Sequence, residues 1–111
     1  MGIVITNNAY IAAKERLGFK KNATERMALR ALMDGINTYE TSGQLFKYLE
    51  KRQEQNGQQN IVYKIYGENV YAFANNTDLY GERSIILVTV FMVPKELRNH
   101  VKSVIKRLEA A

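Results

Sequence analysis

The side chains of this chain that best suit chemistry are cations and phenol rings that recur along its length. Cations attract phosphates and phenol rings stack on unpaired bases, so together they suit a single-stranded nucleic acid. A single tyrosine more often covers the edge of a sheet, so the combination with cations carries the prediction. The candidate nucleic-acid-binding residues are Lys14, Arg16, Lys20, Lys21, Lys64 and Tyr66.

One hydroxyl, that of Thr89, stands inside the apolar run SIILVTVFMVP at 84–94. Threonine forms strands readily and can satisfy its hydroxyl locally, which gives a structural interpretation. A hydroxyl that faced a cationic cleft at the centre of a sheet would instead hold a phosphate. Both interpretations are open at this point.

Several kinds of chemistry are disfavoured by what the sequence lacks. It has no cysteine, so neither disulfides nor thiolate metal sites are available. It has no phosphate-cradling glycine loop, no dinucleotide fingerprint and no G-x-S-x-G motif. The only histidine, His100, has one acid in register, Glu96, and a solvated helix residue is the better interpretation. We therefore expect no cofactor and no metal.

The net charge of +5 and the pI near 9.5 indicate an acidic partner, either a nucleic acid or an acidic protein surface. Excess charge also keeps proteins soluble, which is the plainer explanation. The first ten residues, MGIVITNNAY, have neither the cationic start nor the long apolar core of a signal peptide. No apolar run approaches the roughly 20 residues of a membrane helix. We expect a soluble, cytoplasmic protein without a membrane partner.

The candidate residues are far apart in sequence, so a fold must bring them together. A chain of 111 residues makes one domain with its own core. We expect an α+β fold in which N-terminal helices pack on an antiparallel meander of three or four strands, with a C-terminal helix. The expected parts are a mainly helical segment at 1–57, the β-meander at 58–93 and the C-terminal helix at 94–109.

Helical signals fill the first half of the chain. Asn7 or Asn8 is expected to cap a helix that runs to Leu17, where Gly18 supplies a left-handed stop. Two further helices are expected, from Asn22 to Asp34 with its end at Gly35, and from Thr41 or Ser42 into the polar tract around Gly57.

Strand signals fill the second half. Strands are expected at 61–66 and 70–74 around a tight turn at 67–69, followed by a loop at 75–83. The run from 84 is apolar on both alternating faces, which is typical of a central strand covered on both sides. Its expected faces are 85/87/91/93 and 86/88/90/92. The expected apolar stripe of the last helix consists of Leu97, Val101, Val104, Ile105 and Leu108.

Short motifs spread over most of the chain match one pattern. They are Thr6-Asn7-Asn8-Ala9, Lys14-Glu15-Arg16-Leu17-Gly18, the alanine-rich helix ending at Gly35, Ile65 to Phe73, and Leu87-Val88-Thr89-Val90 followed by Pro94-Lys95. In these motifs the chain resembles a RelE/barnase-like group of small proteins found on phages and other mobile elements. The resemblance implies helices followed by a strand meander, the fold of many metal-independent ribonuclease toxins.

The resemblance also implies where a catalytic site would lie. Such families usually carry a histidine on the first helix, where this chain has Asn8, and asparagine cannot exchange a proton near neutral pH. Basic and hydroxyl groups would then do the work, as in RelE-type toxins, which often lack the histidine. The candidate catalytic residues are Lys64, Tyr71, Arg16 and Thr89.

Two functional hypotheses follow, beside that of a structural module with incidental charge. The first is an RNA-binding protein whose partner is RNA or a ribonucleoprotein, with metal-independent cleavage by 2′-hydroxyl attack on the adjacent phosphate. Lys64 or Tyr71 would assist that attack, while Arg16 and Thr89 hold the phosphate. The alternative is a catalytically inactive phage or mobile-element inhibitor of a host defence protein or ribonucleoprotein, of the anti-CRISPR type. The first hypothesis requires these cationic and phenolic side chains to meet on one side of the sheet.

Overall fold

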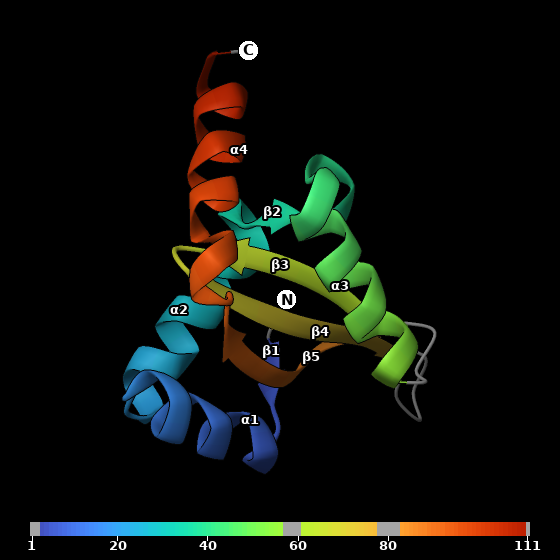
Figure 1. The fold of residues 1–111 in the computed structure, drawn as a ribbon. Coiled ribbons are helices and arrows are strands. Elements are labelled where there is room, and N and C mark those ends of the chain that lie inside the picture. Colours follow the sequence, from blue (N-terminus) through green and yellow to red (C-terminus); the bar gives the residue numbers. More distant parts are fainter. Residues whose placement is uncertain (1–2, 57–60, 78–82, 111) are drawn as a thin grey trace.

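The computed structural model describes residues 3–56, 61–77 and 83–110, and it confirms the α+β class with helices at the N-terminal side and one at the C-terminal end (Figure 1). The first half contains β1 (Ile3–Ile5), α1 (Asn7–Ala12), the π-helix η1 (Ala13–Leu17), α2 (Lys21–Asp34), β2 (Ile36–Asn37), the 3₁₀ helix η2 (Thr38–Glu40) and α3 (Gly43–Asn56). The second half contains β3 (Ile61–Tyr66), β4 (Asn69–Thr77), β5 (Arg83–Met92), the 3₁₀ helix η3 (Lys95–Leu97) and α4 (Arg98–Ala110).

The five strands form one mixed sheet in the order β1-β5-β4-β3-β2. The expected antiparallel meander is present as β3-β4-β5, and two short edge strands extend it. One of them, β1, runs parallel to β5 and pairs only with Ile85 to Leu87. The sheet is therefore larger than the expected three or four strands, because segments of three and two residues add its edges.

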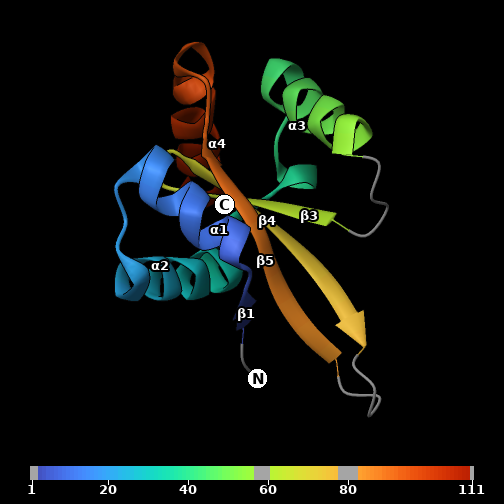
Figure 2. The same cartoon turned by 90° about the horizontal axis from the view of Figure 1, so that it is seen from below.

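Two helices cover each face of the sheet (Figure 2). On one side, which we call the α1–α2 face, small alanines of both helices let the backbone approach the sheet, where Tyr71, Phe73, Leu87 and Val90 are buried. On the other side, the α3–α4 face, Leu45 and Leu49 of α3 and Val101 and Val104 of α4 pack on the strands. The far part of the β4–β5 hairpin extends beyond all four helices (Figure 2).

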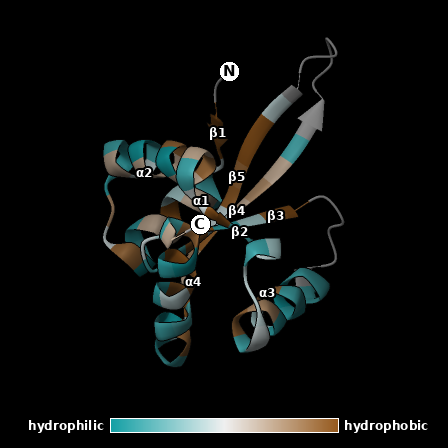
Figure 3. Cartoon of the chain, turned by 90° about the horizontal axis from the view of Figure 1, so that it is seen from above, coloured by the Kyte–Doolittle hydropathy of each residue, from teal (hydrophilic) through white to brown (hydrophobic). Residues whose placement is uncertain are grey.

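A β-bulge interrupts β5 and changes which residues share a face. Ala72 pairs with Thr89, but the next residue of β4, Phe73, pairs with Leu87, so Val88 is an extra residue. As a result Leu87 packs on the α1–α2 face, whereas Phe91 packs on the α3–α4 face. The expected alternation 85/87/91/93 was therefore wrong, although β5 is apolar along most of its length (Figure 3).

The helix boundaries lie close to the predicted ones, but some helices begin or end for a different reason than expected. The first helix is capped by Thr6 rather than Asn7 or Asn8, since the Thr6 hydroxyl oxygen accepts a hydrogen bond from the Ala9 amide at 3.1 Å. Its last turn, Ala13–Leu17, is π-helical and ends at Gly18, whose φ of 71° is the expected left-handed stop. At the end of α2, Gly35 has φ −67° and is extended; a Cβ there would lie 2.3 Å from the Ala31 carbonyl oxygen.

The hairpin and the last helix also differ from expectation. Residues 75–77 belong to β4 and Arg83 to β5, so every residue of the predicted loop at 75–83 that the structure describes is strand. Residues 78–82 lie outside the described residues. The turn is the two residues Gly67 and Glu68, with φ 65° at the glycine. Along α4, which projects beyond the sheet (Figure 1), Val101 and Val104 are buried but Ile105 and Leu108 are exposed.

None of the helices in the described ranges is both long and apolar enough to cross a bilayer.

Candidate functional site

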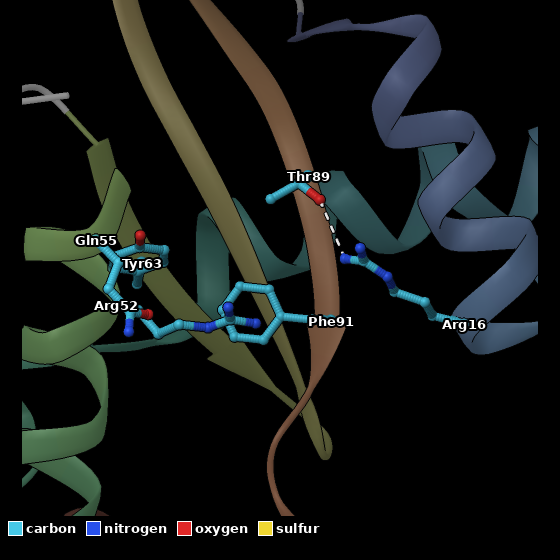
Figure 4. Close-up of a pocket in the computed structure, with 6 residues that line it drawn as sticks. All are labelled: Arg16, Arg52, Gln55, Tyr63, Thr89 and Phe91. Atoms are coloured by element: carbon cyan, nitrogen blue, oxygen red, sulfur yellow. Dashed lines mark hydrogen bonds between the residues drawn. The ribbon is translucent and has the colours of Figure 1, made fainter. Parts of the chain in front are cut away.

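Two of the predicted site residues, Arg16 and Thr89, meet in a pocket on the α3–α4 side of β5 (Figure 4). The pocket has a volume of about 250 Å³. Arg16 enters it from η1 and Arg52 from α3, so that the two guanidinium groups approach from opposite sides of Phe91 (Figure 4). The residues that line this arginine pocket are Arg16, Arg52, Gln55, Tyr63, Thr89 and Phe91.

The position of Arg16 follows from the short length of β1. Because β1 pairs with β5 only as far as Leu87, the carbonyl of Val90 lies on a strand edge that β1 does not cover. The Arg16 Nη1 donates to that carbonyl at 2.8 Å and to the Thr89 hydroxyl at 3.4 Å. The guanidinium therefore bonds to a carbonyl that a neighbouring strand would otherwise pair with. Its other N–H groups remain available beside the pocket.

Arg52 is held by an aromatic ring rather than by an acid. Its guanidinium carbon lies 4.1 Å from the centre of the Phe91 ring, within the range of a cation–π contact. Tyr48 and Tyr63 each meet the Phe91 ring edge-on, which fixes this platform. The Nε of Arg52 is buried and has no hydrogen-bond partner. Arg52 thus lines the pocket with a guanidinium whose Nε has no protein acceptor.

No acid among the described residues offsets the charge of the pocket. No carboxylate is among the lining residues, and the structure pairs no acid with Arg16 or Arg52 within the described ranges, where the one ion pair joins Arg98 and Glu68. Two like charges across a partly enclosed space repel each other, and an anion between them removes that repulsion. The planar forks of two arginines and the Thr89 hydroxyl are suited to the oxygens of a phosphate.

The other candidate catalytic residues lie on the opposite face of the sheet, so the expected convergence was wrong. Tyr71 is fully buried against the alanines of α1 and α2. Lys64 pairs with it across β3 and β4, and Tyr66, two residues on, shares that face. The bulge at Val88 is the physical reason: in an unbroken strand Thr89 would share a face with Leu87, beside Tyr71, but the extra residue turns it to the α3–α4 face.

Burial also makes Tyr71 a poor proton-transfer group. It raises the pKa of the Tyr71 hydroxyl, and the side chain of Asn69 opposes this shift only in part. The hydroxyl oxygen is buried and has no partner within hydrogen-bonding geometry. Tyr71 is therefore placed as a core residue.

Three of the candidate nucleic-acid-binding residues gather at a second cavity, where α1, η1 and the start of α2 meet. Its volume is about 600 Å³, and it shares no lining residue with the arginine pocket. The lining residues, which we call the lysine corner, are Asn7, Tyr10, Lys14, Phe19, Lys20 and Lys21.

The sequence did not single out Arg52, Gln55 and Tyr63. A signal for Arg52 was present, since Leu45, Leu49 and Arg52 follow each other at spacings of four and three, which places the arginine near the core-facing side of a helix. Tyr63 lies on the strand face opposite Lys64, because side chains alternate along β3. Phe91 was counted as core, and it is both buried and a wall of the pocket.

Metal-ligating side chains do not cluster in the part of the chain that the structure describes: no three His, Cys, Asp or Glu side chains lie close enough to hold an ion. His100 lies on α4, away from both cavities.

No family model, no curated protein and no solved structure matches this chain. The RelE/barnase-like resemblance therefore stays a prediction.

Proposed function

We propose that this protein binds RNA and that the arginine pocket takes a phosphate of the strand. The observation that carries the proposal is the pair of arginines from separate elements, Arg16 and Arg52, that flank one pocket without a carboxylate. Arginine forks bind phosphate oxygens in a bidentate manner, and the Thr89 hydroxyl, which accepts from Arg16, still has its own hydrogen to donate.

A polyanion fits the molecule better than a single small anion. The net charge of +5 attracts a phosphate backbone over a wide surface, and the lysine corner offers further cations beyond the pocket. Phe91 and Tyr63 are buried in the wall of the pocket, but Tyr10 and Phe19 of the lysine corner are partly exposed and add aromatic surface. Single-stranded RNA presents both phosphates and unpaired bases to such a surface.

Binding rather than cleavage is the function that these groups support best. Guanidinium groups do not lose a proton near neutral pH, so Arg16 and Arg52 bind and orient a phosphate but do not act as general bases. Lys64 and Tyr71, the expected helpers of the 2′-hydroxyl attack, lie on the far face of the sheet. Cleavage of the RNA is therefore measured separately from binding in the test below.

The test compares two variants of α3 that each lose one positive charge. Arg52→Gln removes the guanidinium at the pocket, and Lys47→Gln removes an exposed ammonium outside it. Binding of a dye-labelled oligouridine is followed by fluorescence anisotropy in the presence of a chelator. We expect Arg52→Gln to weaken binding roughly tenfold or more, since charge-assisted hydrogen bonds contribute about 1.5–3 kcal/mol, and Lys47→Gln to weaken it less than about threefold.

No binding of the oligouridine at low salt, or an equal loss in both variants, overturns the proposal. The same samples are run on a gel. Cleavage that Arg52→Gln abolishes would extend the function to that of a metal-independent ribonuclease.

A protein partner is the second candidate, favoured by apolar side chains that lie exposed among cations on α2. Met33 is 72% exposed and Leu29 is 47% exposed, with Arg26 and Arg30 beside them on the helix. Such a surface suits an acidic host protein or ribonucleoprotein. A stoichiometric protein recovered from a host lysate after nuclease treatment, and lost with Met33→Glu, would favour this candidate over RNA.

A further inference from the structure

The lysine corner is a cavity in its own right, with a size typical of sites for small organic ligands. Its volume of about 600 Å³ falls within the range of roughly 300–1,000 Å³ for such sites. Three elements build it: α1 contributes Asn7 and Tyr10, η1 contributes Lys14, and the segment through the start of α2 contributes Phe19, Lys20 and Lys21.

The chemistry of the lysine corner combines cations with aromatic rings. Its three lysines form no ion pair with any acid that the structure describes. The nearby carboxylate of Glu25 is engaged, since it accepts a hydrogen bond from the Tyr10 hydroxyl at 3.0 Å. Tyr10 and Phe19 supply the apolar wall. A ligand that matches both properties carries negative charge next to a flat aromatic group, which is the chemistry of a nucleotide.

The Tyr10 ring is oriented but not blocked. The bond to Glu25 fixes the phenol, and desolvation together with this partner raises its pKa, so the hydroxyl keeps its proton near neutral pH. The Lys21 ammonium lies 5.9 Å from the ring centre, at the outer limit of a cation–π contact. This weak contact leaves Lys21 able to move to a phosphate while a base stacks on the ring.

The π-helix η1 connects this cavity with the arginine pocket. Lys14 and Arg16 lie two residues apart on η1, and the first lines the lysine corner while the second lines the arginine pocket. π-helical turns occur often at functional sites. The segment η1 therefore contributes one cation to each cavity.

We propose that the lysine corner is a second subsite for single-stranded RNA, in which an unpaired base stacks on Tyr10 or Phe19 and the lysines hold its phosphate. This inference rests on the proposed function and adds a base-binding site to it. It implies that one strand is held at a phosphate in the arginine pocket and at a base in the lysine corner.

The test separates base contact from phosphate contact by using two probes of equal length, an oligouridine and an abasic ribose-phosphate oligomer. Tyr10→Leu removes the ring, and we expect it to weaken oligouridine binding on the order of tenfold while binding of the abasic oligomer stays unchanged. Tyr39→Leu is the matched control, because Tyr39 is 80% exposed and lies outside both cavities.

Photo-crosslinking of an oligomer that contains 5-iodouridine locates the base directly. We expect the crosslink at Tyr10 or Phe19 when the modified peptide is identified by mass spectrometry. A third variant, Tyr10→Phe, keeps the ring but loses the bond to Glu25, and we expect it to retain most of the oligouridine affinity. All variants are compared by thermal unfolding, so that a loss of fold is distinguished from a loss of contact.

The outcomes distinguish this inference from the proposed function. If oligouridine binds and Arg52→Gln weakens it, but Tyr10→Leu behaves like Tyr39→Leu and no crosslink forms in the lysine corner, the second subsite is overturned and the arginine pocket stands. A loss in Tyr10→Phe as large as that in Tyr10→Leu also overturns the stacking role. If the protein binds neither oligomer, the proposed function itself fails.

Discussion

At the scale of single residues, Arg52 is the side chain whose position is hardest to explain by folding alone. Its Nε is buried without a partner, and its charge rests on the Phe91 ring instead of an acid. A buried donor that lacks an acceptor costs about 1–3 kcal/mol, so this side chain lowers the stability of the fold rather than raising it. Such a residue is expected where binding rather than stability determines the side chain.

Arg52→Met should therefore separate stability from function. The lost cation–π contact, about 0.5–1 kcal/mol, and the removed unpartnered donor act in opposite directions, so we expect the free energy of unfolding to change by less than about 1 kcal/mol. Oligouridine affinity should fall roughly tenfold. Urea unfolding and anisotropy measure the two quantities. A loss of several kcal/mol in stability would make Arg52 a structural residue.

Tyr71→Phe tests the placement of Tyr71 in the core. The buried hydroxyl has no partner within hydrogen-bonding geometry, although the Asn69 side chain lowers its pKa, so its removal should change the free energy of unfolding near neutral pH by less than about 1 kcal/mol, with RNA binding unaffected. Burial raises the pKa of Tyr71 in the folded state, so above pH about 10 the unfolded chain ionises first and stability falls.

We expect this loss at high pH to be smaller in Tyr71→Phe than in the wild type, as measured by urea unfolding across an alkaline pH series. A variant that loses RNA binding at neutral pH while staying folded would restore Tyr71 as a functional candidate.

At the scale of elements, Thr6 joins the first helix to the sheet. Its hydroxyl oxygen caps α1, and the same hydroxyl lies 3.2 Å from each of the carbonyl oxygens of Leu87 and Val88, next to the bulge. The contact places α1, and therefore η1 and Arg16, at a fixed position along β5. One side chain thus links the start of a helix to the strand that carries Thr89.

Thr6→Ala should cost about 1–2 kcal/mol of stability, since it removes a helix cap and a contact to the sheet. The residues that the sequence favoured as caps provide the controls: Asn7→Ala and Asn8→Ala change exposed side chains and should each cost less than about 0.5 kcal/mol. Thermal unfolding of the three variants decides the order. Equal losses in all three would contradict the assignment of the cap.

The sequence predicted most elements because their signals are local. Gly18 stops the first helix, Gly67 opens the hairpin turn, and periodic apolar residues mark α3 and α4. The bulge at Val88 was hidden because β5 is apolar on both faces, so a shift by one residue leaves the hydrophobic pattern unchanged. The pocket was missed for the same reason, since it depends on which face Thr89 occupies.

At the scale of the whole molecule, the arginine pocket combines cations from elements on both sides of the sheet. Arg16 and Arg52 belong to elements on opposite faces of the sheet, and they meet only because Arg16 reaches over the edge of β5. The lysine corner is built separately, from α1, η1 and the segment through the start of α2. Such an arrangement depends on long-range packing, which sequence periodicity alone does not predict.

The salt dependence of oligouridine binding measures how many of these cations contact the strand. For a single strand the slope of log affinity against log salt is about −0.7 for each neutralised phosphate. We expect Lys21→Gln to make this slope less steep by about 0.7, the value for one phosphate contact. The control Lys102→Gln changes an exposed lysine of α4 and should leave the slope unchanged. A wild-type affinity independent of salt would contradict an electrostatic interface.

The bond between Arg16 and the Val90 carbonyl has a consequence for how copies of this protein avoid one another. An uncovered strand edge is a template for intermolecular β-pairing, and natural proteins often protect such edges with a charged side chain. Arg16 satisfies the carbonyl and places a positive charge at the same spot, which repels an approaching strand from another copy. Loss of this arginine would therefore remove the proposed phosphate contact and at the same time expose a strand edge prone to aggregation.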